Sequence, residues 1–293
     1  MTGVGTVLAL LALFAQGPEA VRVGRVSAVA WPAQLTLAVV LAEAGDRAAP
    51  FPGVGPLPAR PIRLLLAPDR ARFDSLTRGR LPRWSEGAAF PEAGTVVLLA
   101  VGPPDHLAAS LRHELAHLAL RWRVGRRLPL WFEEGYAAVA AAEWDRLDAL
   151  RLNWQVARGA PLDLDEVDRG LRSDGPDAAT AYALATTAVL LLARWGGPQG
   201  LGPLIDRLAR ERSLDAALRA TYQVTEGDFA ERWQRDVRSR YGWLSWAGAV
   251  GLFWAVTGSL LVWLVVLRRR RDRARRALLD EGWTVPSDEG PTA

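Results

Sequence analysis

The chain has 293 residues, half of them hydrophobic, and a formal net charge of +4. It contains no cysteine, which excludes a disulfide framework and any zinc or redox site built on thiolates. All 36 basic residues are arginine, and outside the C-terminal tail they form no concentrated basic stretch, so a nucleic-acid-binding face is not expected.

The N-terminal segment 1–20 is predicted to be a signal peptide. Its apolar run from Val7 to Ala15 is too short to span a bilayer but suits the hydrophobic region of a secretory signal. No positive charge precedes the run and no clear cleavage site follows it. An uncleaved anchor or a buried N-terminal helix is therefore the alternative.

The segment 21–104 has the patterns of a small α/β part, with short apolar runs separated by turns rich in Pro and Gly. The expected elements are a helix at 31–44, a loop at 48–61, a strand at 62–67, a short helix that begins at Pro68-Asp69, and a hairpin with strands at 87–90 and 95–101. Pro103-Pro104-Asp105 then ends this part, and Asp105 is a candidate N-cap for the next helix.

The segment 105–241 reads as mainly helical. The uncharged stretch 178–193 is short for a membrane span, and its Ala and Thr content favours a central buried helix.

The segment 243–267 holds 25 uncharged residues with Trp near both ends, as a transmembrane helix would. The basic tail 268–293 follows, and the positive-inside rule places it in the cytoplasm and the preceding part outside. The alternative for this segment is a buried core helix beside a solvated basic tail.

The motif His-Glu-x-x-His lies at residues 113–117, inside a run with helical character. Because four residues are about one helical turn, His113 and His117 project from one face and can share a metal ion. Glu114 lies beside the first ligand, where its carboxylate can take a proton from a metal-activated water. The alternative interpretation is an ordinary helix with two hydrogen-bonded histidines.

A catalytic zinc ion usually has three protein ligands, so this motif needs one more. The one further histidine, His106, lies upstream and is expected to cap the helix or face solvent. The third ligand must then be a carboxylate, and Glu133 and Glu134 on the following helix are the obvious candidates.

HELAH followed by LPLWFEEGYA resembles the bacterial peptidase MA-like (minigluzincin) metallopeptidases, whose catalytic core is similar to that of the gluzincins. The matching residues after the first motif are Pro129, Trp131, Phe132, Glu134 and Gly135. The resemblance extends over about residues 60–240, with AYALATTAVLLLARWGG and TEGDFAERWQ as its later matches. It implies that Glu134 is the third ligand of one zinc ion.

The resemblance also implies roles outside the ligand set. A later helix would supply an oxyanion-stabilising group, here Tyr182, although a core tyrosine is the alternative. The strand before the active helix would pair with substrate backbone, here through Gly87, Ala88 and Ala89. One position departs from the family pattern: a carboxylate that orients the first histidine is expected four residues after the third ligand, but Ala138 stands there. Asp145 or a backbone carbonyl is the expected substitute.

The predicted fold class is therefore α+β: a small N-terminal sheet packed on the helix that carries HExxH, then a mainly helical subdomain and one C-terminal transmembrane helix. The predicted function is a membrane-anchored zinc metallopeptidase that faces away from the cytoplasm and cleaves peptide or protein substrates. The absence of a carboxylate at Ala138 and the weak signal for a substrate pocket motivate an alternative, a membrane-tethered, peptidase-like binding module with weak catalysis or none. An intramembrane protease is disfavoured because arginines flank the motif on both sides.

Overall fold

A computed structural model describes residues 17–79, 81–144, 146–160, 162–175, 177–241 and 243–281. The chain divides into two units, residues 1–242 and residues 243–293, which are considered separately below. Most of the predicted signal peptide, residues 1–16, lies outside the described residues.

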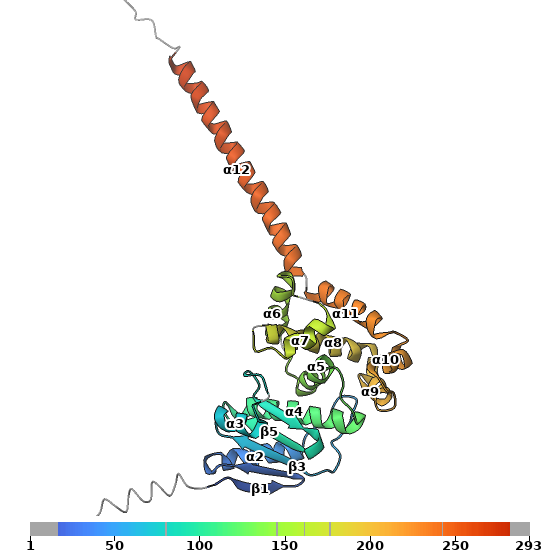
Figure 1. The fold of residues 1–293 in the computed structure, drawn as a ribbon. Coiled ribbons are helices and arrows are strands. Elements are labelled where there is room, and N and C mark those ends of the chain that lie inside the picture. The colour runs from blue at the N-terminus through green and yellow to red at the C-terminus, as the bar shows by residue number, and fades with distance from the viewer. Residues whose placement is uncertain are drawn as a thin grey trace, which may run out of the picture. The chain divides into compact units, whose positions relative to one another are not determined.

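The first unit begins with a five-stranded sheet in the order β1-β2-β3-β5-β4 (Figure 1). Its strands are β1 (Glu19–Val23), β2 (Val26–Ala30), β3 (Ile62–Ala67), β4 (Gly87–Phe90) and β5 (Thr95–Leu99). The three central strands are parallel, and the two edge strands β1 and β4 run antiparallel to their neighbours. The strand predicted at 62–67 and the hairpin around 91–94 are confirmed.

The hairpin formed by β1 and β2 was not predicted. Gly24 takes a positive φ of 53° at its turn, which glycine adopts without a steric penalty. The Arg25 backbone N–H donates to the Asp46 carboxylate at 3.0 Å, which ties the turn to the end of a helix. Because β1 begins at Glu19, the boundary predicted at residue 20 falls inside a strand of the sheet.

Helices cover both faces of the sheet. The helices α2 (Leu35–Asp46), which follows the short 3-10 turn Pro32–Gln34, and α4 (Pro104–Val124) pack on one face. The helix α3 (Arg70–Thr77) packs on the other face, where Phe73 is fully buried. The Asp69 side chain accepts a hydrogen bond from the Arg72 backbone N–H and caps α3, so the predicted helix start at Pro68-Asp69 is confirmed.

The remainder of the first unit is helical, as predicted. Its helices are α5 (Leu130–Ala141), α6 (Arg146–Ala157), α7 (Leu164–Leu171), α8 (Asp177–Trp195), α9 (Gly202–Leu208), α10 (Leu214–Tyr222) and α11 (Glu226–Tyr241). The central one is α8, whose Thr187 hydroxyl accepts a hydrogen bond from the buried Trp233 indole at 3.0 Å. The buried helix predicted at 178–193 is confirmed by α8.

The second unit contains one long helix, α12 (Trp243–Glu281). Within the described residues, one helix is long and apolar enough to cross a membrane, and it is α8, 56% of whose apolar window is buried. The described side chains of α12 begin at residue 254, and the stretch 254–273 is not apolar because it includes the arginines that start at Arg268. The transmembrane helix at 243–267 therefore stays a prediction.

Candidate metal centre and active site

The helix α4 carries the HExxH motif between the sheet and the helical part. Leu107, Leu111 and Leu115 recur at helical spacing and pack into the core with the sheet. His113 and His117 project from another side of the helix, with ring centroids 4.9 Å apart. The N-cap of α4 is Pro103 rather than the predicted Asp105, which lies in the first turn, where a negative charge favours the helix N-terminus.

The next helix, α5, positions Glu134. The Trp131 backbone N–H at its first turn donates to the Asp168 carboxylate at 2.6 Å, which fixes the start of α5. Gly135 permits a close approach of α5 to α8, because a Cβ there would lie 2.7 Å from the Ala185 carbonyl carbon. Packing against α4 and α8 therefore holds the carboxylate of Glu134 next to the two histidines.

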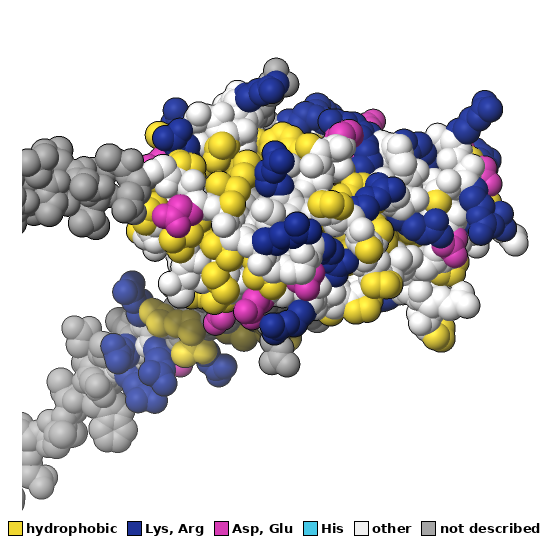
Figure 2. Space-filling view, turned by 90° about the horizontal axis from the view of Figure 1, so that it is seen from below, with side chains coloured by type: hydrophobic (Ala, Val, Ile, Leu, Met, Phe, Trp, Pro, Cys, Tyr) yellow, Lys and Arg dark blue, Asp and Glu magenta, His cyan; other side chains and the backbone are white. Residues whose placement is uncertain are grey.

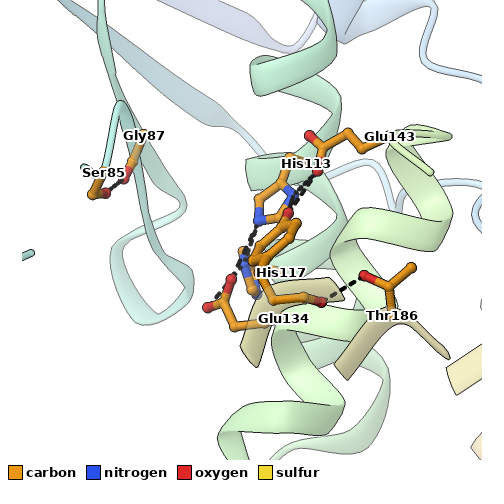
Figure 3. A network of polar contacts seen from close by, with 8 residues as sticks. Ser85, Gly87, His113, His117, Glu134, Glu143 and Thr186 are labelled. Atoms are coloured by element: carbon orange, nitrogen blue, oxygen red, sulfur yellow. Dashed lines mark hydrogen bonds and ion pairs between the residues drawn. The ribbon is translucent and has the colours of Figure 1, made fainter. Parts of the chain in front are cut away.

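The structure brings together the three residues predicted as metal ligands. One donor atom each of His113, His117 and Glu134 lies within 4.8 Å of the others. The two Nε2 atoms are 3.2 Å apart, and the Glu134 carboxylate oxygens lie 3.5 Å from His113 Nε2 and 3.7 Å from His117 Nε2 (Figure 3). Two imidazole nitrogens and one carboxylate are a donor set that suits a zinc ion with one open position.

The neighbouring Glu133 and His106 have other partners. The Glu133 carboxylate accepts a hydrogen bond from the Leu128 backbone N–H at 2.8 Å and lies 4.0 Å from Arg121. His106 Nε2 lies 2.6 Å from the Glu86 carboxylate in an exposed pair. Of the two glutamates that the motif spacing left open, Glu134 is the one that reaches the histidines.

Burial and mutual charge shift the pKa values of the site in opposite directions. Burial acts to lower the pKa of His113, but hydrogen bonds with Glu134 and Glu143 outweigh it and raise that pKa well above its usual value. Burial lowers the pKa of His117 to about 4. Burial acts to raise the pKa of Glu134, yet the nearby histidines bring it below its usual value. The neighbouring carboxylates therefore favour the protonated form of His113, and a metal ion at Nε2 would compete with that proton.

The candidate general base, Glu114, is buried between α4 and the edge strand β4. A Cβ at Gly87 would lie 2.8 Å from both Cγ and Cδ of Glu114, so only glycine leaves room for this carboxylate. Burial raises the pKa of Glu114 to about 8, with Glu134 and Glu143 acting in the same direction. At neutral pH such a carboxyl group is largely protonated, and the positive charge of a bound metal ion would lower this pKa and favour the ionised form that accepts a proton.

The strand β4 forms an edge of the sheet beside this carboxylate. The Leu99 N–H donates to Glu86 O at 2.8 Å, and the antiparallel register places Gly87 opposite Leu98. Hydrogen-bonded and non-hydrogen-bonded pairs alternate in such a ladder, so the backbone groups of Gly87 and Ala89 point away from β5. Those of the third predicted substrate residue, Ala88, point toward β5, and its side chain is buried. Two of the three residues can thus pair with an added strand.

The arrangement of HExxH on one helix and a glutamate before glycine on the next agrees with a comparison to known families. The model of the family described as the peptidase MA superfamily matches residues 70–239, more than half of the chain. The chain belongs to the peptidase MA superfamily. The family predicted from the sequence is thereby confirmed. No curated protein and no solved structure matches the chain.

Within this peptidase MA fold, the Tyr182 hydroxyl makes hydrogen bonds on the side of His113 that faces away from Glu134. Its hydroxyl donates to the Glu143 carboxylate at 2.6 Å and lies 3.0 Å from His113 Nδ1. Nδ1 is on the opposite side of the ring from Nε2, which faces Glu134. Tyr182 therefore contacts the back of a candidate metal ligand, and its role toward a substrate oxyanion stays a prediction.

Sequence reasoning missed Glu143. Its carboxylate lies 3.2 Å from His113 Nδ1 and so contacts the histidine that Ala138 leaves without a carboxylate partner. The expected substitute, Asp145, lies outside the described residues. The sequence signal that could have pointed to Glu143 is that two acidic residues, Glu143 and Asp145, follow soon after the end of α5. Choosing between them required the backbone conformation at the helix end.

Proposed function

We propose that this member of the peptidase MA superfamily is a zinc-dependent metallopeptidase. The observation that carries the proposal is the convergence of His113, His117 and Glu134 beside the buried carboxylate of Glu114. When bound, a zinc ion supplies Lewis acidity toward a carbonyl group and lowers the pKa of a water molecule to about 7.

The residues of the chain account for the remaining steps of peptide hydrolysis. Glu114 takes a proton from the attacking water and passes it to the departing amine, a role that its buried position beside His113 and the edge strand β4 supports. The outward backbone groups of Gly87 and Ala89 hold the substrate as an added strand next to Glu114. The Ser85 hydroxyl, which donates to Gly87 O at 2.7 Å, would have to release that carbonyl (Figure 3).

The alternative of a binding module without catalysis was motivated by Ala138. Glu143 supplies a carboxylate that contacts His113, and this contact supports hydrolysis as the function that we propose.

We further propose that the predicted signal peptide and the apolar segment 243–267 place the peptidase domain on the outer side of a bacterial cytoplasmic membrane, with the basic tail inside. The absence of charge from this segment and the arginines that follow it support this topology. Substrates would then be peptides or proteins outside the cytoplasm. Figure 2 shows arginines interspersed with apolar and acidic side chains on one face of the molecule.

The test is peptide-library cleavage by the full chain in detergent, together with measurement of bound zinc. Glu114→Gln should keep one zinc ion per chain and lose cleavage by about 100-fold or more, because it removes the general base. The matched control is Glu133→Gln, whose amide oxygen can still accept from Leu128 N–H; it should keep both properties. A wild-type chain without stoichiometric zinc, or a Glu114→Gln variant that cleaves normally, would refute the proposal.

A further inference from the structure

The end of α5 has a backbone conformation that determines where the following residue lies. Ala142 adopts a left-handed φ of 56°, which is uncommon for a residue other than glycine. The Glu143 N–H donates to Ala138 O at 3.1 Å, and the Ala142 N–H donates to Val139 O at 3.3 Å. This capping pattern reverses the chain and returns Glu143 to the level of Ala138.

The same pattern brings two positions together that are five residues apart in the sequence. Ala138 follows Glu134 by one helical turn and is buried, but its methyl group cannot accept a hydrogen bond. The Glu143 carboxylate instead reaches His113 Nδ1 at 3.2 Å (Figure 3). A carboxylate is thus present at the back of the histidine, although it comes from the helix end and not from the helix itself.

The hydrogen-bonding capacities of the Tyr182 hydroxyl and the Glu143 carboxylate fix the tautomer of His113. Tyr182 has one hydroxyl hydrogen, which it donates to Glu143 at 2.6 Å, so its oxygen can only accept toward His113. A carboxylate also only accepts. Because both neighbours of Nδ1 are acceptors, Nδ1 must carry the hydrogen, and the Nε2 lone pair is left for a metal ion.

We propose that Glu143 and Tyr182 are positioning residues that hold His113 in its metal-binding tautomer and orientation. Glu143 performs from the left-handed end of α5 the task that a carboxylate at position 138 would perform from within the helix. Tyr182 orients the Glu143 carboxylate, because its hydroxyl contacts both that carboxylate and His113 Nδ1. This inference rests on the proposed function, in that His113 is taken to be a ligand.

The experiment measures the zinc affinity of the full chain by chelator competition and the absorption spectrum of its cobalt-substituted form. Glu143→Ala should weaken zinc binding by about 10- to 100-fold and alter the cobalt spectrum, because His113 loses its carboxylate partner. Tyr182→Phe should weaken binding less, since the contact between Glu143 and Nδ1 remains. Glu231→Ala, at an exposed site on α11, is the control and should match the wild type.

A second-site variant separates positioning from general damage to the fold. Adding Ala138→Asp to Glu143→Ala places a carboxylate one turn after Glu134 and should restore a large part of the lost zinc affinity. Glu143→Gln keeps the shape of the side chain and should bind zinc more tightly than Glu143→Ala.

Three outcomes bear on the inference and on the proposed function separately. Wild-type zinc affinity and an unchanged cobalt spectrum in Glu143→Ala would overturn the inference. So would a double variant that folds but recovers no affinity. A wild-type chain that binds no stoichiometric zinc would instead refute the proposed function itself, before any variant is compared.

Discussion

Gly87→Ala is a small change that should affect catalysis far more than folding. Gly87 does not have a left-handed backbone conformation, so alanine can adopt the same strand geometry. The new methyl group would, however, lie 2.8 Å from Cγ and Cδ of Glu114, closer than ordinary van der Waals contact. Because the backbone of β4 is held by β5, the glutamate side chain has to move.

The size of the effect follows from that overlap. Restoring normal contact requires a shift of the Glu114 carboxylate on the order of 1 Å, and a misplacement of this size can cost about 100-fold in rate. This corresponds to about 2.7 kcal/mol in the activation free energy. Alanine is preferred over glycine in a strand by about 0.5–1 kcal/mol, which offsets part of the strain, so the free energy of unfolding should change by less than about 1 kcal/mol.

The assay compares kcat/KM on a peptide substrate, zinc affinity and thermal unfolding for the wild type and the variant. Gly202→Ala is the matched control, because no atom lies within 4 Å of a Cβ added there. Zinc affinity should be unchanged in both variants, since Glu114 is not a ligand. A Gly87→Ala variant with wild-type kcat/KM would refute the reasoning. A parallel fall in zinc affinity would also refute it, because the substitution would then have displaced the zinc-binding side chains as well as Glu114.

Two further predictions concern pH and packing. Zinc affinity should rise with pH through the neutral range, because the raised pKa of His113 favours a proton that zinc binding has to displace. Chelator competition across pH measures this rise, and a flat profile would contradict it. Gly135→Ala should lower the free energy of unfolding by about 1–3 kcal/mol, because its methyl group overlaps the Ala185 carbonyl on α8 and both helices resist separation. Thermal denaturation measures that loss, and an unchanged Tm would show that α5 and α8 can move apart freely.

Short-range patterns accounted for much of the fold. The short apolar run of β3, the capping of α3 by Asp69 and the uncharged stretch that forms α8 are local signals, and each element is confirmed. The β1–β2 hairpin escaped prediction, since its edge strand is largely exposed and it follows directly on an apolar N-terminal run. Its place in the sheet depends on the parallel pairing of β2 with β3, which joins segments more than 30 residues apart.

The sequence by itself determined the candidate metal site, because helical periodicity places His113 and His117 on one face and the family motif selects Glu134. Only the tertiary structure decided what lies behind those ligands. Glu143 reaches His113 because Ala142 takes a left-handed conformation that its residue type does not signal. Tyr182 joins that group because α8 packs against α5. Contacts of this kind depend on how separate helices meet, and no local pattern of residues encodes them.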